Sequence, residues 1–249
     1  PLVTLTAMTA QRAWVWGDLK RIAAEGVLRH PDSLRAHLER ATILLQTGKF
    51  AESEEVMLHL AESSNPKNRA IGFYGVATIQ CIDGNKADAR LMDHADENLR
   101  TPITLFDMQT LDLLLRASSE KHCAGVDLAR VLQTLERQLA LAVSQPVTDG
   151  PVWRVHLLAA SYYAQLGELS TAVQHGRHAW QPTADLAAGV FLAELQLRSG
   201  LTDAAAQTIE ELKLRSLARE PAAKDAIHRL DIRLNEFLAR KRNSGIGRK

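Results

Sequence analysis

The feature that most constrains this chain is a triplet of small residues that recurs with a fixed spacing. Between Pro31 and Pro66, two amphipathic segments meet at Gly48, and small residues stand seven positions before and five positions after this glycine. Small side chains let two antiparallel helices approach closely, because larger ones would hold the backbones apart. The spacing occurs four times, in Ala41, Gly48 and Ser53, in Ala77, Gly84 and Ala89, in Ala160, Gly167 and Ala172, and in Ala193, Gly200 and Ala205. The second triplet follows the first by 36 residues throughout (41 to 77, 48 to 84, 53 to 89), which predicts a helical repeat.

Apolar residues recur at helical spacing on both sides of the glycine, as Leu34, Leu38 and Leu45 do before Gly48. The chain of 249 residues is 46% apolar but only 5% aromatic, a balance that suits closely packed helices better than a β-sandwich. We therefore expect an all-α fold, a right-handed α-solenoid superhelix of about twelve helices in antiparallel pairs.

The repeats predict one domain over residues 1–249. Residues 1–30 form an N-terminal half-repeat, 31–220 the repeats, 221–243 a capping helix and 244–249 a flexible tail. Residues 101–145 lack the small-residue triplet and are expected to form a divergent repeat. There Thr101 is expected to cap a helix whose first residue is Pro102.

The period and the four triplets resemble the tetratricopeptide-repeat (TPR) family, over roughly residues 14–220. The aromatic residue that often stands early in each first helix of that family is mostly absent, so these are degenerate repeats. The resemblance implies a helical scaffold that binds a protein or peptide in the groove lined by the first helices.

A second resemblance covers the opening AWVWGDLKRIAAEGVLRHPDSLRAH, with Trp14, Trp16 and the Pro31-Asp32-Ser33 junction. It is similar to the segment where bacterial polytopic membrane proteins resembling protein O-mannosyltransferases pass into a C-terminal TPR domain. This resemblance implies an extracytoplasmic, periplasmic domain attached to the membrane only through an upstream segment. Any glycosyltransferase chemistry would then belong to that upstream portion. The alternative is a soluble cytoplasmic TPR adaptor or regulator.

The register of the small residues predicts which side chains line the groove. They are Arg35, Leu38, Thr42, Leu45, Gln46, Tyr74, Thr78, Arg154, Leu157, Ser161, Gln165, Val190, Glu194 and Arg198. This mixture suits a peptide with apolar anchors and a few polar contacts.

Catalytic, metal and cofactor motifs find no support in the sequence. His175 and His178 share a helix face without the HExxH frame of a zinc enzyme, and no phosphate-binding glycine loop or GxSxG elbow occurs. The net charge of +1 gives no reason to expect a nucleic-acid partner. We therefore expect a non-catalytic chain without cofactor or metal, although a hydrolase hidden in the groove remains a weaker third alternative.

The chain contains two cysteines, Cys81 and Cys123, which lie near the ends of successive first helices. Successive first helices of a solenoid run parallel, so both turns emerge on the same edge, about 8–10 Å apart. A turn residue can close that gap to the roughly 4.4–6.8 Å between Cα atoms that a disulfide needs. We expect either this bridge, which would favour an oxidising compartment, or two unrelated free thiols.

Overall fold

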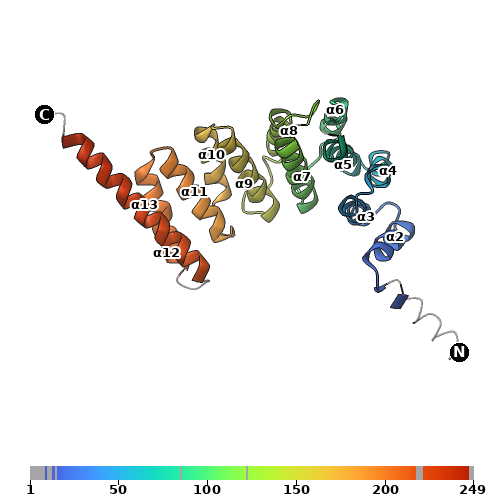
Figure 1. Ribbon diagram of the computed structural model, residues 1–249, viewed down its shortest axis with the longest axis horizontal. Coiled ribbons are helices and arrows are strands. Elements are labelled where there is room, and N and C mark those ends of the chain that lie inside the picture. Colours follow the sequence, from blue (N-terminus) through green and yellow to red (C-terminus); the bar gives the residue numbers. More distant parts are fainter. Residues whose placement is uncertain are drawn as a thin grey trace. The chain divides into compact units, whose positions relative to one another are not determined.

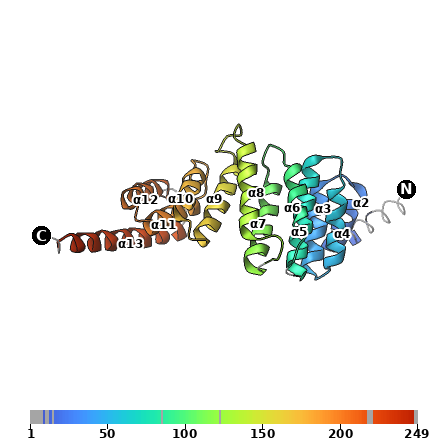
Figure 2. The same cartoon turned by 90° about the horizontal axis from the view of Figure 1, so that it is seen from above.

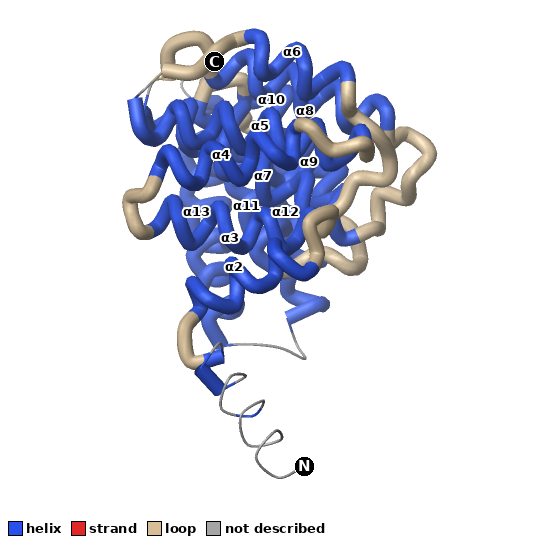
Figure 3. Tube along the Cα trace, turned by 90° about the vertical axis from the view of Figure 1, so that its right-hand side faces the viewer, coloured by secondary structure: helices blue, strands red, loops and turns tan. Residues whose placement is uncertain are grey.

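The computed structural model describes residues 9, 13–14, 16–84, 86–121, 123–216 and 221–246, and this part of the chain is all-α. It contains twelve helices, α2 to α13, and Figure 3 shows helices joined by loops along the described trace. Among the described residues, the β-type pairing is confined to one isolated bridge between Lys86 and Ala124. The prediction of an all-α array of antiparallel helix pairs is confirmed.

The contacts divide the chain into two compact units, which we describe separately. Unit 1 comprises residues 1–102 and 106–141, and unit 2 comprises residues 103–105 and 142–249. The predicted continuity of a single domain over residues 1–249 stays a prediction. Within the described residues, none of the helices combines the length and apolar character that crossing a bilayer requires.

Unit 1 contains seven helices in sequential arrangement. They are α2 (Leu19–Arg29), α3 (Leu34–Gln46), α4 (Phe50–Ala61), α5 (Pro66–Gly84), α6 (Arg90–Glu97), α7 (Leu105–Lys121) and α8 (Leu128–Leu141). Each of α2 to α5 packs on the next helix, and α6 packs on α5 and α8. Figures 1 and 2 show α3, α4, α5 and α6 side by side.

Local signals in the sequence account for the helix boundaries near the start of unit 1. Asp18 caps α2, because its carboxylate accepts the backbone N–H of Lys20 at 2.8 Å. Ser33 caps α3 in the same way, as its hydroxyl accepts the N–H of Ala36 at 3.3 Å. Gly48 lies in the turn between α3 and α4 with a φ of 71°, a left-handed conformation that favours glycine.

The first small-residue triplet brings α3 and α4 together as predicted. Ser53 is fully buried and its hydroxyl donates to the carbonyl of Ala41 across the helix pair at 2.9 Å. Between α4 and α5 the backbones also approach closely, since a Cβ on Gly72 would lie 2.3 Å from the backbone nitrogen of Ala61. The core of this part gathers around Met57, Leu60 and Ile71.

The second triplet does not behave like the first, which corrects the sequence prediction. Gly84 belongs to the end of α5 instead of a left-handed turn, and Ala89 is exposed. The return helix α6 begins only at Arg90 and has 8 residues. The physical reason lies in Lys86 and Ala87, because Lys86 forms a bridge with Ala124 and the N–H of Ala87 donates to the carbonyl of Ala124 at 2.9 Å.

Unit 2 repeats the pattern of close antiparallel pairs. Its helices are α9 (Gly150–Gln165), α10 (Leu169–Ala179), α11 (Leu186–Arg198), α12 (Thr202–Ser216) and α13 (Pro221–Ile246). Gly167 and Gly200 have φ values of 82° and 73°, so the third and fourth triplets turn as the first one does.

The helix α13 packs against α11 and α12, and the capping role predicted for residues 221–243 stays a prediction. Ile227, Leu230 and Leu234 join the core built by α11 and α12, and so α13 covers that end of unit 2. The helix continues to Ile246, so residues 244–246 of the predicted tail are helical, while residues 247–249 lie outside the described part.

The divergent repeat begins later than predicted. Helix α7 starts at Leu105, so Thr101 and Pro102 precede it instead of capping and opening it. The backbone of Ile103 is held outside the helix by Gln145, whose Oε1 accepts the Ile103 N–H at 2.7 Å. The Gln145 amide Nε2 also donates to the Ile103 carbonyl at 3.1 Å, which completes a two-bond pairing.

Candidate functional site

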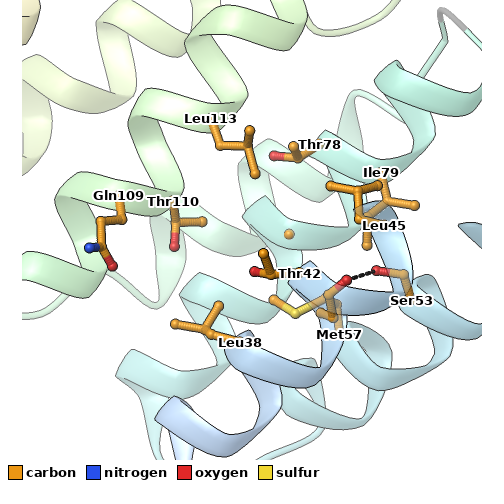
Figure 4. Close-up of a pocket in the computed structure, with 12 residues that line it drawn as sticks. Leu38, Thr42, Leu45, Ser53, Met57, Thr78, Ile79, Gln109, Thr110 and Leu113 are labelled. Carbon is orange, nitrogen blue, oxygen red and sulfur yellow. Dashed lines mark hydrogen bonds between the residues drawn. The ribbon is translucent and has the colours of Figure 1, made fainter. Parts of the chain in front are cut away.

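Unit 1 contains an apolar pocket of about 330 Å³ between the first helices of its pairs and α4. Figure 4 shows side chains of α3, α4, α5 and α7 converging on this space. Each of its twelve lining residues is uncharged, and they are Leu38, Ala41, Thr42, Leu45, Ser53, Met57, Gly75, Thr78, Ile79, Gln109, Thr110 and Leu113.

Small residues create the space and Met57 forms part of its floor. The side chain of Met57 passes over Gly75, where a Cβ would lie 2.1 Å from the Met57 methyl carbon. Ala41 and Ser53 leave further room at the base because their side chains are small, and the hydrogen bond from Ser53 to the Ala41 carbonyl holds α3 and α4 together there. The triplet that sets the repeat spacing therefore also shapes the pocket.

The polar residues of the pocket divide into two kinds. The hydroxyls of Thr78 and Thr110 donate to carbonyls of their own helices, Tyr74 at 2.7 Å and Phe106 at 2.8 Å, so they present methyl groups and satisfied oxygens. Thr42 and Gln109 are exposed at the edge, where they can form hydrogen bonds with a bound chain. The arrangement suits an apolar side chain whose backbone stays near the rim.

An ion pair joins α5 and α7 at one end of this pocket. The ammonium of Lys67, near the start of α5, lies 2.9 Å from Oδ2 of Asp107 in the first turn of α7. The same ammonium also donates to the Pro102 carbonyl. Asp107 is buried, so removing either partner would leave a charge with little access to water.

A disulfide joins the same two helices at their other end. Cys81 on α5 is bonded to Cys123, which follows α7, with 5.2 Å between the Cα atoms, the pairing suggested by the sequence. Beside it, the Ala87–Ala124 backbone hydrogen bond and Gly125, with a φ of 91°, bring the two turns into direct contact. The α7–α8 turn is therefore attached to the α5–α6 segment both covalently and through its backbone.

The structure brings only part of the predicted groove together in unit 1. Leu38, Thr42, Leu45 and Thr78 line the pocket, as the helix register suggested. Arg35 and Gln46 are exposed on α3 away from the lining, and Arg35 pairs with Glu39 at 2.8 Å.

Tyr74 is a correction to the predicted groove, because it is 1% exposed and belongs to the core. Burial raises the pKa of its phenol well above the usual value, and the nearby carboxylates of Asp96 and Asp107 add to the effect. Asp96 in turn lies 2.9 Å from Arg130 and 2.5 Å from Arg137, which connects α6 to α8. The ion pairs of Asp96 with Arg130 and Arg137 therefore join α6 to α8 close to the buried Tyr74.

The predicted groove residues of unit 2 lie on α9 and α11, and several of them already have partners. The Arg154 guanidinium lies over the Trp153 ring at 4.3 Å, while its Nη2 is 4.0 Å from Asp185. Glu194 lies 3.4 Å from Arg233 of α13, and Val190 packs against the core that α13 completes. The others are half-buried (Leu157 and Ser161) or exposed (Gln165 and Arg198).

Eight of the twelve residues that line the pocket are not among the predicted groove residues. Gly75 and Ile79 replace Tyr74 on α5, which means that this helix is rotated slightly from the register copied from α3. Gln109, Thr110 and Leu113 come from the divergent repeat, where the missing triplet left no register to follow. Their spacing of one and three residues on an amphipathic helix is the signal that could have placed them on one face.

The histidines of unit 2 come closer together than the sequence indicated. Nδ1 of His156 on α9 lies 3.0 Å from Nδ1 of His175 on α10, and the His178 ring is 5.0 Å from that of His156. Within the described ranges, no group of three or more His, Cys, Asp or Glu side chains has an arrangement that could hold a metal ion.

Comparison with known proteins found likeness in structure alone. No family model matches the chain, and no curated protein matches it either. Two crystal structures of nearly identical TPR-like repeats from a Podosopora anserina kinesin light chain are similar to it. For a single-substitution variant, the identity is 16% and the TM-score 0.48, covering 74% of this chain and 95% of that one. For the other structure the identity is 15% and the TM-score 0.46, covering 85% of this chain and 98% of that one.

Proposed function

We propose that this chain is a non-catalytic protein-interaction scaffold whose unit 1 pocket binds an apolar side chain of a partner peptide. The observation that carries the proposal is a pocket with an entirely uncharged lining, framed by the first helices of successive repeats. The burial of a leucine- or methionine-sized anchor would contribute roughly 1.5–3 kcal/mol. Thr42 and Gln109 at the rim would bond with the peptide backbone.

The absence of charge in the lining decides which class of peptide fits. A terminal carboxylate or an acidic motif would need a cationic partner to offset its desolvation, and the lining offers none. An extended or helical segment with one neutral apolar anchor has no charge to desolvate when it binds, so it fits this lining.

We propose that the chain works on the extracytoplasmic face of a bacterial membrane, as part of a protein resembling a membrane glycosyltransferase. The resemblance of residues 14–36 to the junction in such proteins supports this, and the disulfide fits an oxidising compartment. A cytoplasmic adaptor is the second candidate. About ten hydrophobic spans encoded upstream would support the membrane context, whereas a start codon directly before Pro1 would refute it.

Peptide selection on the oxidised chain tests the pocket. Leu113 in the lining and Leu58 on α4 outside it are 40% and 43% exposed, so they form a matched pair of sites for substitution. Leu113→Glu places a carboxylate in the apolar pocket and should weaken a selected peptide at least about tenfold, or 1.4 kcal/mol. Leu58→Glu should leave the affinity unchanged. Equal affinities for both variants, measured by titration calorimetry, would remove the pocket from the binding site.

A further inference from the structure

The unit 1 pocket lies between two cross-links that join α5 and α7 at opposite ends. The Lys67–Asp107 ion pair connects the first turns of these helices, and the Cys81–Cys123 disulfide connects the last turn of α5 to the residues after α7. The 14 residues from Lys67 to Cys81 correspond to about 21 Å of helix. The walls that α5 and α7 contribute to the pocket stand between these points.

Each cross-link lies within one helical turn of a pocket wall. Cys81 follows Thr78 by three residues on α5, and Asp107 precedes Thr110 by three residues on α7. Three residues span about 4.5 Å along a helix, so a shift at a cross-link moves the neighbouring wall with it. The separation of α5 and α7, and hence the width of the pocket, depends on both connections.

At the disulfide end, the two turns also meet through backbone contacts. These are the Lys86–Ala124 bridge, the Ala87–Ala124 hydrogen bond and the close approach of Gly125, while the ion pairs of Asp96 with Arg130 and Arg137 join α6 to α8. A Cβ on Gly125 would be 2.2 Å from the Ala87 carbonyl oxygen, so this contact depends on a glycine in a left-handed conformation. Loss of the bond would allow this seam between the two turns to open.

We propose that the redox state of Cys81 and Cys123 regulates the unit 1 pocket, so that only the oxidised chain binds its peptide tightly. This inference rests on the proposed function. Reduction takes two electrons from a dithiol: the Cys81–Cys123 bond breaks, both sulfurs become thiols, and the dithiol closes to its own disulfide. The freed α7–α8 turn then moves from α5, and the walls around Thr78 and Leu113 separate.

The burial of the bridge determines how this regulation works. Cys81 and Cys123 are 0% and 3% exposed, so a dithiol reaches the sulfurs only when the turns open locally. The redox state is therefore set when the chain folds in its compartment and is exchanged slowly afterwards. The pocket becomes competent as a consequence of oxidative folding.

The methyl group of Met57 reports the pocket without any partner. The full 249-residue chain, labelled with ¹³C at the methionine methyl groups, is compared by NMR before and after reduction with dithiothreitol. The Met57 signal should shift or broaden on reduction and return on reoxidation. The Cys81→Ala/Cys123→Ala variant should show the reduced-state signal with or without dithiothreitol.

A second variant keeps the test decisive where reduction unfolds the chain. Gly125→Ala retains the disulfide but opens the same seam, and it should shift Met57 in the same direction by a smaller amount. An unchanged Met57 signal in a reduced chain that keeps its α-helical circular dichroism overturns the proposal. If the reduced chain unfolds, an unchanged Met57 signal in Gly125→Ala does so.

The affinity of a peptide selected on the oxidised chain separates this inference from the function on which it rests. At least a tenfold loss after reduction supports the regulation. Equal affinity in both states overturns the regulation and leaves the binding function intact. Failure to select any pocket-dependent peptide removes the proposed function, while the Met57 signal still shows whether the bridge sets the pocket.

Discussion

Units 1 and 2 use the same small-residue triplet but use the space between helices differently. In unit 2, α13 fills the position beside α11, where Val190 and Glu194 meet it. In unit 1, α5 and α7 are cross-linked at their ends and leave an apolar pocket between them. Identical repeat chemistry can therefore produce either a closed core or an open binding surface, depending on what the neighbouring segment contributes.

The largest effect that separates the units should come from removing the disulfide. Cys81→Ala/Cys123→Ala releases a covalent loop with a sequence separation of 42. On the chain-entropy relation this lowers the free energy of unfolding by roughly 4 kcal/mol. Hydrogen exchange read by mass spectrometry should show lost protection in α5 to α8 and unchanged protection in α9 to α12. Equal loss in both units would show that they unfold as one cooperative body.

Substitutions at two glycines test how tightly the helices are packed around each one. In unit 2, a Cβ on Gly189 would lie 2.7 Å from Trp180 and 2.8 Å from Leu212, whereas Gly84 in unit 1 has open space around it. Gly189→Val should therefore lower the free energy of unfolding by about 1–3 kcal/mol through overpacking. Gly84→Ala should change it by less than about 0.5 kcal/mol, since it adds no contact. Urea denaturation measures both, and a large cost at Gly84 would contradict the open α5 end.

The smallest expected effects concern the hydrogen bonds that cross each helix pair. The hydroxyl of Ser53 donates to a backbone carbonyl in unit 1, and that of Thr208 donates to the Gln196 side chain at 2.9 Å in unit 2. Ser53→Ala should cost about 1 kcal/mol. Thr208→Val should cost nearer 2 kcal/mol, because it leaves the buried Gln196 oxygen without this donor. Thermal unfolding followed by circular dichroism ranks the two, and the opposite order would mean that Gln196 finds another donor.

The sequence predicts the fold well wherever the triplet is complete and its glycine is free to turn. Gly48, Gly167 and Gly200 all adopt the left-handed turn, and the helices on either side end where the periodicity indicates. Gly84 has the same spacing and behaves differently, because its turn is replaced by an extended segment paired with Ala124. That pairing depends on residues almost 40 positions away, which a local pattern does not report.

The candidate site is less predictable for a related reason. Leu38 and Thr42 follow from the helical register, since α3 begins and ends at recognisable caps. The same register applied to α5 predicts Tyr74 in the groove, whereas α5 is rotated slightly, so that Gly75 lines the pocket and Tyr74 is buried. Leu113 came from a repeat without the triplet. Residue identity constrains which faces are apolar, while tertiary contacts decide which apolar face remains open.

The Cys81–Cys123 disulfide also changes how the polypeptide of unit 1 is connected covalently. Between Cys81 and Cys123 the molecule has two covalent routes, one through α6 and α7 and one through a pair of sulfur atoms. A protease that cuts a peptide bond on the first route leaves both fragments linked, and they separate only after reduction. Exposed sites such as Asp88 and Arg90 therefore lie on a stretch where a single nick does not divide the chain.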